Sequence, residues 1–448
     1  MKVFMLGWEF PPHISGGLGT ACYGMTKGLD EIGVKVCFVL PTAVPIDTAS
    51  HVQFRSPTNL PAVGKPDSGE SGEFEHVSVR HVKAALQAYA TPAGFEQAIT
   101  KMVARQREMA IASRGGKAVT KERRMAPLPS GTFDGGAGAH YGGDLMGQVH
   151  RYARLAVELA ESEEFDVVHA HDWMTYPAGV AVSAATDRPL VVHVHSTEFD
   201  RSGENINRQV YMIERNGMHN ADKVVCVSYL TRNVAISRYD VPPQKIEVVY
   251  NAVDLPNNTE LAMVPIRQNE KIVLFLGRVT MQKGPEYFLQ AAKKVIQKYP
   301  NVRFVMAGSG DKITHCVKMA ADLKIGGYVT FTGFLRGADV DRIFQMADLY
   351  VMPSVSEPFG IAPLEALSHN VPVIISKQSG VSEVLTHALK VDFWDVDEMA
   401  NKILAVLRHP PLRKALRQQG HIELKKFSWT DSAKRLREIY DSVAVGGA

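Results

Sequence analysis

The sequence is poor in cysteine and has no long apolar run. Its 448 residues include only four cysteines, which lie far apart: Cys22, Cys37, Cys226 and Cys316. The absence of C-x-x-C spacing argues against both a disulfide scaffold and a zinc ribbon. No apolar stretch approaches the roughly 20 residues of a membrane-spanning helix, and the N-terminus lacks a secretory cleavage site. We therefore expect a reducing, cytoplasmic location and no transmembrane segment.

Neither sign of charge dominates the chain. Lys and Arg number 50 against 47 Asp and Glu, which gives a net charge of +3. Residues 101–124 carry eight of the basic residues and only two acidic ones, so the positive charge is concentrated in one segment. Nucleic-acid-binding proteins usually carry positive charge over a domain or along one face. We therefore expect no nucleic-acid partner.

Apolar runs alternate with helical patterns in two separate series. The first series has predicted strands at residues 2–6, 34–40, 165–171, 190–195, 223–228 and 246–251, and the second at 272–277, 302–308, 328–331, 349–353 and 371–376. Continuous β-branched runs followed by helices are typical of parallel strands buried on both faces. The sequence thus predicts an α/β fold in which two doubly wound, Rossmann-like sheets face each other across a cleft.

The same patterns predict the domain organisation. We expect an N-terminal domain over residues 1–262, a C-terminal domain over 263–428, and a terminal helix over 429–448 that returns to the first domain. A polar stretch at 254–270 is predicted to be the linker. Residues from about 42 to 145 are rich in Gly, Ala, Pro and basic residues and lose the strand–helix rhythm. We expect an irregular basic excursion there, with one helix over 95–112.

Glycines follow the first strand at the point where a helix should begin. In open parallel sheets the ligand lies beyond the carboxyl ends of the strands. Gly16 and Gly17 stand at such an end, and glycine lets backbone N–H groups approach an anion at a helix N-terminus. The alternative is a tight turn with no ligand.

Two cations, Arg278 and Lys283, leave the first strand of the second series five residues apart. A pair of fixed positive groups beyond a strand end suits a diphosphate, which gains charge as it departs. The alternative is that both are solvated surface residues. Their position directly after the first strand of a domain favours the diphosphate site.

The stretch from Glu357 to Glu365 is the most informative in the chain. Pro358 and Gly360 keep Glu357 in a loop, whereas Pro363 is tolerated only in a first helical turn. The N–H groups after Gly360 should therefore point out of a helix start that two carboxylates flank. Such an arrangement suits a sugar nucleotide. Capping by an acidic residue would explain Glu365 and would leave Glu357 unexplained.

Two His-x-His pairs, His169/His171 and His193/His195, end neighbouring predicted strands. A neutral His195 could bond a sugar hydroxyl, whereas a packed, hydrogen-bonded core position fits His193 better. No third and fourth ligand with convincing spacing joins either pair, so we expect no metal. Asp172 has an alternative role as the cap of a helix that begins at residue 173. We likewise expect the Asp-x-Asp triplets at 339–341 and 395–397 to cap helices.

These motifs resemble retaining glycosyltransferases of the GT-B fold, family 4, and in particular the glycogen and starch synthases. The resemblance spans both sheet domains and leaves out residues 42 to 145. Its most specific element is the E-x7-E signature, Glu357 to Glu365. Further stretches support it: Gly277-Arg278 with Lys283-Gly284, residues 248–254, Glu9-Phe-Pro-Pro with Gly16-Gly17-Leu-Gly, His169-Ala-His-Asp-Trp and residues 195–200.

The resemblance implies a role for each matched residue. Arg278 and Lys283 would hold the donor's diphosphate, and His195 would hydrogen-bond the sugar near its anomeric carbon. Glu357 would grip the hydroxyls of the donor sugar, and Glu365 those of the ribose. The other residues that it places at the donor are Gly16, Gly17, Gly308, Phe359, Gly360 and Ile361, with Glu9 and Asp172 on the acceptor or sugar side.

The implied activity is retaining, metal-independent transfer of a hexose from a nucleoside-diphosphate sugar to an α-glucan, with glucose favoured and no cofactor. Bacterial ADP-glucose synthases carry a lysine where this chain has Ser15, so UDP, ADP or another base stays open. The alternatives are another α-linkage of exopolysaccharide or sucrose type, a nucleotide-sugar isomerase and a non-catalytic glucan-binding relative. A hydrolase that uses Glu357 and Glu365 as its acid and base or nucleophile is a further alternative.

Overall fold

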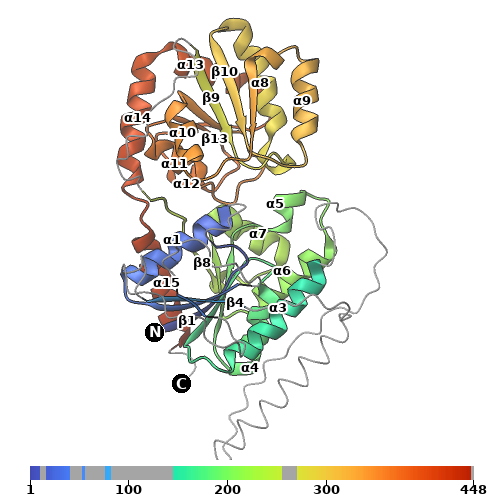
Figure 1. The fold of residues 1–448 in the computed structure, drawn as a ribbon, viewed down its shortest axis with the longest axis vertical. Coiled ribbons are helices and arrows are strands. Elements are labelled where there is room, and N and C mark those ends of the chain that lie inside the picture. Colours follow the sequence, from blue (N-terminus) through green and yellow to red (C-terminus); the bar gives the residue numbers. More distant parts are fainter. Residues whose placement is uncertain (11–16, 41–52, 56–75, 82–144, 255–269, 445–448) are drawn as a thin grey trace, which may run out of the picture.

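The computed structural model describes residues 1–10, 17–40, 53–55, 76–81, 145–254 and 270–444, which build two α/β domains stacked end to end (Figure 1). The N-terminal sheet has the strand order β3-β4-β2-β1-β5-β6-β7-β8, and the C-terminal sheet has the order β11-β10-β9-β12-β13-β14. The pairing of neighbouring strands is parallel throughout both sheets. This confirms the predicted pair of doubly wound sheets.

The strands of the first sheet are β1 Lys2–Leu6, β2 Lys35–Leu40, β3 Gln53–Arg55, β4 Val77–His81, β5 Val167–His171, β6 Leu190–Val194, β7 Lys223–Cys226 and β8 Ile246–Val248. Those of the second are β9 Lys271–Leu276, β10 Val302–Ala307, β11 Val329–Gly333, β12 Leu349–Met352, β13 Val373–Ser376 and β14 Leu389–Val391.

The helices of the N-terminal half are α1 Gly17–Glu31, α3 Leu145–Ala160, α4 Tyr176–Thr186, α5 Glu198–Ser202, α6 Arg208–Asn220 and α7 Tyr229–Tyr239. Those that follow are α8 Pro285–Lys298, α9 Ile313–Asp322, α10 Ala338–Met346, α11 Ala362–Ser368, α12 Val381–Val384, α13 Val396–Arg408, α14 Pro410–Leu424 and α15 Trp429–Ala444. Short 3-10 turns cover Pro243–Lys245, Met281–Lys283 and Gly326–Tyr328. Among these residues no helix has both the length and the apolar character that crossing a membrane requires.

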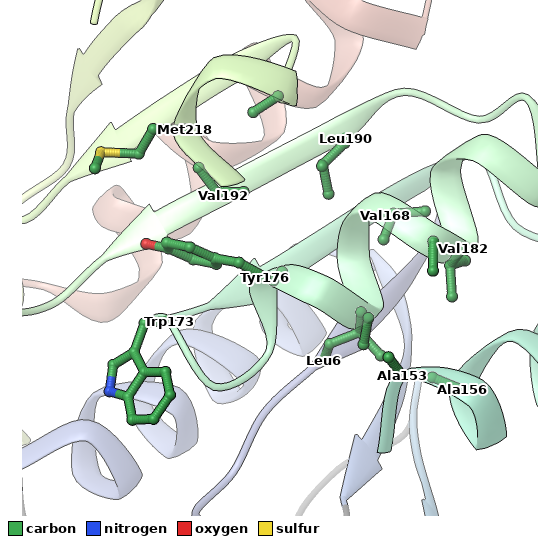
Figure 2. Packing of buried hydrophobic residues seen from close by; sticks show 14 of the residues in the cluster. Leu6, Ala153, Ala156, Val168, Trp173, Tyr176, Val182, Leu190, Val192 and Met218 are labelled. Carbon is green, nitrogen blue, oxygen red and sulfur yellow. The ribbon is translucent and has the colours of Figure 1, made fainter. Parts of the chain in front are cut away.

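Both faces of the N-terminal sheet are buried, which explains why its central strands are apolar throughout. One face packs against α3, α4 and α6, and Figure 2 shows this core, where Val168 and Val192 of the sheet meet Tyr176 and Val182 of α4. The Tyr176 hydroxyl donates a hydrogen bond of 3.0 Å to the backbone oxygen of His193. The side chain of this buried tyrosine therefore ties α4 to β6.

The opposite face of that sheet is covered by α1 and by α15, the last helix of the chain. Two glycines of α1 allow this contact. A Cβ at Gly24 would lie 2.0 Å from the Trp429 ring, and one at Gly28 would lie 2.4 Å from the Trp429 backbone oxygen. The chain therefore leaves the C-terminal domain after α14 and ends on the N-terminal domain (Figure 1).

The C-terminal sheet is covered in the same way. Helices α8, α9 and α13 bury one face, and α10 and α11 bury the other. The strands β9 and β12 end on the side of this domain that faces the N-terminal domain (Figure 1). Arg278 follows β9, before the 3-10 turn η2 (Met281–Lys283), and Glu357 follows β12, before α11.

The structure corrects the sequence analysis in the first half of the chain. Within the segment expected to be irregular, β4 pairs with β2, and β3 pairs with β4. Helix α3, which follows that segment, was not predicted although it is strongly amphipathic and buries Tyr152. The remaining excursion, the predicted helix over 95–112 and the linker over 255–269 lie outside the described residues.

Candidate active site

Two loops at the carboxyl ends of the C-terminal strands are joined by an ion pair. The Nζ atom of Lys283 lies 2.5 Å from Oε2 of Glu357, and the Ser354 hydroxyl donates to the same oxygen at 3.1 Å. Glu357 is buried and the Lys283 side chain is 22% exposed. A carboxylate and an ammonium thus meet where β9 and β12, neighbours in the sheet, come to an end.

Arg278 belongs to the same loop pair. Its guanidinium donates to the Gln282 side chain at 3.3 Å, and the Gln282 backbone oxygen accepts from the Val355 N–H at 2.8 Å. The Arg278 residue is exposed, so a charged group can reach it from solvent. The structure therefore brings Arg278, Lys283 and Glu357 together.

Gly284 and Gly360 shape this site. Gly284 has φ +63°, and a Cβ there would lie 2.1 Å from the Pro353 backbone oxygen, so only glycine lets the two loops approach. Gly360 has φ +104° and directs the chain from the Glu357 loop into α11. Ile361 is the N-cap residue of α11, and among the described residues no side chain caps this helix.

Glu365 lies in the first turn of α11. Burial raises its pKa to about 7, and the nearby Asp341 adds to the effect. Glu365 sits on the helix that directly follows the Glu357 loop, and its pKa is in the range of physiological pH.

The Glu357 loop is hydrogen-bonded to the N-terminal domain. Ser228, the N-cap of α7, donates through its hydroxyl to the Pro358 backbone oxygen at 2.5 Å, and Thr231 donates to the same oxygen at 3.3 Å. The Ser356 hydroxyl donates to Asp200 at 2.5 Å. The residues on either side of Glu357 are therefore both held by the other domain.

A carboxylate of the C-terminal domain also caps α7. The two Glu383 oxygens accept from the backbone N–H groups of Tyr229 at 2.9 Å and Leu230 at 2.6 Å. These are free N–H groups of a first helical turn, where an anion is favoured. This contact adds a third interdomain attachment close to the candidate site.

On the N-terminal side, Asp172 holds the loop that begins at His195. Asp172 has φ +59°, and its Oδ1 accepts from the N–H groups of His195 at 2.8 Å and Ser196 at 3.2 Å. Burial raises the Asp172 pKa to about 7. The expectation that Asp172 caps the next helix is wrong, because α4 begins at Tyr176 with Thr175 as its N-cap.

Charged side chains hold the segment that follows His195, residues 196–201. Arg201 donates to the Ser196 backbone oxygen at 3.2 Å and to Glu198 at 3.2 Å, and it also pairs with Glu214. Asp200 accepts from the Thr197 N–H in a capping box. His195 thus lies between β6 and α5, in a connection that these hydrogen bonds and ion pairs hold in place.

The four histidines of the two His-x-His pairs share one face of β5 and β6. The parallel register sets His171 opposite His193, and the ring centroids of His193 and His195 are 4.3 Å apart. His171 Nδ1 lies 2.9 Å from His195 Nε2. Burial lowers the pKa of His195 to about 3, which keeps its ring neutral.

His193 differs from its predicted environment. It is fully buried, as expected of a core residue, yet within the described part of the chain neither of its ring nitrogens has a hydrogen-bond partner.

The remaining predicted residues lie at strand ends, at helix starts or in the packed core. Glu9 follows β1, and Gly17 is the first residue of α1, whereas Gly16 lies outside the described residues. Gly308 is required by packing, since a Cβ there would lie 1.8 Å from the Gly277 backbone oxygen. The Phe359 side chain is buried in the core of the C-terminal domain, and Ile361 contacts the cores of both domains.

The Asp-x-Asp triplets lie at helix starts. Asp395 is the N-cap of α13 and accepts from the Glu398 N–H at 2.8 Å, which confirms the predicted cap. Asp339 and Asp341 lie within the first turn of α10 rather than before it. Asp339 pairs with the exposed Arg342, and Asp341 lies 3.2 Å from the largely buried His369.

Sequence analysis missed several contacts that position the site, although it placed Ser228 at the end of a predicted strand. Gln282, Ser228 and Glu383 act through backbone contacts between segments far apart in the chain. Tyr440, whose hydroxyl lies 2.7 Å from His169 Nδ1, comes from the last helix. Only Ser228 carried a local signal, since it directly follows the last residues of a strand and precedes a helix.

Two Rossmann-like sheets with charged loops between them define the GT-B class of architecture. Residues 102–256 match the model of the family described as Glycosyltransferase Family 4, and residues 258–422 match that of Glycosyl transferases group 1. The first match begins inside the segment that the sequence resemblance left out. The chain is therefore a family 4 glycosyltransferase of the GT-B fold.

Individual relatives extend this similarity to the whole chain. An uncharacterized glycosyltransferase of Methanocaldococcus jannaschii is 26% identical over 98% of both chains, and a glycogen synthase of Mycobacterium tuberculosis is 23% identical over 98% of this chain and 94% of its own. Among solved structures, sucrose-phosphate synthase from Thermosynechococcus elongatus has a TM-score of 0.68 at 16% identity and covers 100% of both chains. Anabaena HepE in complex with UDP and glucose has a TM-score of 0.66 at 17% identity, over 99% of this chain and 100% of its own.

Proposed function

We propose that the protein is a retaining hexosyltransferase that moves glucose from a nucleoside-diphosphate sugar to an α-glucan acceptor, as a glycogen synthase does. The observation that carries the proposal is the group formed by Arg278, Lys283 and Glu357, which two loops hold together beside the other domain. The full-length similarity to a glycogen synthase supports the choice of acceptor, and the HepE complex with UDP and glucose supports the choice of donor.

The two cations would serve the leaving group. As the glycosidic bond of the donor breaks, negative charge develops on the diphosphate, and groups that are already oriented toward it stabilise the transition state. Arg278 is exposed and Lys283 is partly exposed, so both can reach a bound diphosphate. In this proposal their charge replaces a metal ion at the diphosphate, and no cofactor takes part.

The carboxylates and His195 would hold the sugars. Glu357 accepts hydrogen bonds from donor-sugar hydroxyls, and Glu365 accepts from those of the ribose. A neutral His195 bonds the hexose near its anomeric carbon, and Glu9 and Asp172 lie on the acceptor side. Because hydrolysis is the competing reaction, the interdomain bonds at Pro358 and Ser356 would hold the site closed against water during transfer.

The second candidate is a family 4 transferase that makes another α-linkage to a small acceptor. The structural likeness to sucrose-phosphate synthase over the whole chain favours it. The two candidates share the donor site, so only the acceptor separates them.

The test is a panel of UDP-, ADP- and GDP-sugars, each incubated alone, with glycogen, with maltooligosaccharides and with small sugars. We expect UDP-glucose or ADP-glucose with glycogen to give an α-linked product by NMR, with no gain in kcat/KM on adding Mg²⁺ or Mn²⁺. Transfer only to a small acceptor would select the second candidate. Conversion of the donor without any acceptor, or cleavage of glycosides without nucleotide, would overturn both.

A variant pair ties that activity to the site. Arg278→Ala should reduce kcat/KM for the donor by about 100-fold, since removal of one preorganised donor to a transition-state anion has about this effect. Arg342→Ala is the matched control, because Arg342 is an exposed arginine of the same domain that pairs with Asp339. Near-normal kinetics of Arg278→Ala would remove Arg278 from the site.

A further inference from the structure

The cluster of His169, His171 and His193 on β5 and β6 contains more unsatisfied polar atoms than a packed core should. All three residues are fully buried. Within the described residues four of their ring nitrogens have no hydrogen-bond partner: His169 Nε2, His171 Nε2, His193 Nδ1 and His193 Nε2. Buried polar groups are almost always paired, and each exception needs a physical reason, such as strain, a functional role, a water or an ion.

The partners that these rings do have leave the free nitrogens available. His169 bonds the Tyr440 hydroxyl through Nδ1 at 2.7 Å, and His171 meets His195 through Nδ1 at 2.9 Å. In the rings of His169 and His171 the Nδ1 side is therefore fixed by a neighbour while Nε2 remains unpartnered, and in His193 both nitrogens are unpartnered. A histidine that ligates a metal is usually held in this way, with one nitrogen on the ion and the other bonded to an outer group.

The three rings are also close enough to share one ion. One ring nitrogen from each of the three histidines lies within 4.8 Å of those of the other two. Zinc–nitrogen bonds of about 2.0–2.1 Å in a tetrahedral site set the nitrogens about 3.4 Å apart, so small ring rotations would complete the geometry. Neutral imidazole is the form of histidine that binds such ions.

We propose that His169, His171 and His193 form a binding site for one first-row divalent transition-metal ion, with Zn²⁺ as the natural occupant. Three imidazoles suit Zn²⁺, Co²⁺ and Ni²⁺ and disfavour Mg²⁺ and Ca²⁺, which prefer oxygen ligands. The site lies on the N-terminal sheet beneath α15, whereas the cations proposed for the diphosphate are on the C-terminal domain. It is therefore distinct from the cations proposed for the diphosphate, and it does not depend on the proposed function.

The ion would link the end of the chain to the candidate site. Tyr440 of α15 fixes the outer nitrogen of His169, and His171 contacts His195 at the candidate site. Occupancy would hold β5, β6 and α15 together and fix the orientation of His171. The sequence hides the site, because spacing along the chain shows only pairs, and the third ligand comes from the neighbouring strand.

The test is a titration of the full-length, untagged protein, after treatment with a chelator, with Co²⁺. We expect one equivalent to bind with the visible d–d bands of a tetrahedral ion, Zn²⁺ to displace it, and Mg²⁺ to leave the spectrum unchanged. His193→Asn should abolish the bands. His315→Asn, which changes a histidine whose side chain is 57% exposed, is the matched control and should keep them.

A second variant keeps the test decisive if His193→Asn folds poorly by circular dichroism. Tyr440→Phe retains all three ligands and removes only the outer hydrogen bond of His169, so Co²⁺ affinity should fall by about 10- to 100-fold while the bands remain. Absence of bands from the wild-type protein would overturn the proposal. Bands that persist in a folded His193→Asn variant, or an affinity unchanged by Tyr440→Phe, would also overturn it.

Discussion

The ion pair between Lys283 and Glu357 predicts that stability and activity can be separated by two substitutions. Lys283→Met keeps the length of the side chain and removes its charge. Among the described residues, the side-chain hydrogen bond that Glu357 then keeps is the one donated by the Ser354 hydroxyl, and its carboxylate stays buried. A fully buried charge that loses its partner costs about 3–5 kcal/mol. The Lys283 side chain is 22% exposed, so we expect a smaller loss of about 2 kcal/mol at pH 8.

The second substitution should reverse that loss. Lys283→Met combined with Glu357→Gln removes both charges and keeps a polar group beside Ser354, and replacing a whole buried pair is often neutral in stability. The unfolding temperature should therefore fall by about 4–8 °C in the single variant and recover in the double variant. Catalysis should not recover. In the proposed function Lys283 binds phosphate, so its loss should lower kcat/KM about 100-fold. Glu357 is proposed to bind the donor sugar, so its loss should lower kcat/KM further.

Scanning calorimetry and donor kinetics on the wild type, both single variants and the double variant give the complete cycle. Lys271→Met is a matched control, because Lys271 also forms an ion pair, with Asp348 at 2.9 Å, at the opposite ends of the strands. An unfolding temperature unchanged by Lys283→Met would show that the pair does not stabilise the protein in solution. Recovery of activity in the double variant would refute the role of both residues in transfer.

Three further outcomes follow from the same contacts. Burial raises the Glu365 pKa from 4.5 to about 7, so the folded state holds a proton that the unfolded state releases, and the free energy of unfolding should fall as the pH rises from about 4.5 to 7. Denaturant titrations should show that the free energy of unfolding depends less on pH in Glu365→Gln than in the wild type. An unchanged pH dependence would contradict the shifted pKa. Gly24→Ala should lower the unfolding temperature by the equivalent of about 1–3 kcal/mol, because the new Cβ meets the Trp429 ring at 2.0 Å, whereas helix propensity alone predicts a rise. Ser228→Ala removes both the α7 cap and a bond to Pro358, so it should cost about 1–2 kcal/mol by calorimetry and raise the donor KM; kinetics equal to the wild type would separate this bond from donor binding.

The sequence predicted the strands well, because each is a continuous apolar run whose burial on both faces leaves a clear pattern. Helix α8, Pro285–Lys298, carries two signals that are visible in the sequence, a proline at its start and an amphipathic face. Strand β4, which lies between β3 and β2 in the sheet, was missed because it lies within a glycine- and proline-rich segment. Its partner β2 is distant along the chain, so no local signal reports the pairing.

Only those parts of the site that follow from the alignment of neighbouring strand ends could be predicted from the sequence. Arg278 and Glu357 follow β9 and β12, which the parallel sheet places side by side, so their proximity follows from the fold class. The bond from Ser228 to Pro358 joins two domains, and the bond from Tyr440 to His169 joins residues 271 apart in the chain. Such contacts depend on the packing of whole helices, which neither spacing nor propensity determines.

Gly17 and Gly308 have similar sequence contexts, but the structure shows different packing around them. Each lies in a glycine-rich stretch that follows a strand. Gly308 has φ +140°, and a Cβ there would lie 1.8 Å from the Gly277 backbone oxygen, so the fold itself requires that glycine. A Cβ at Gly17 would contact no described atom within 4 Å. Packing against the described residues therefore requires glycine at position 308 and does not require it at position 17.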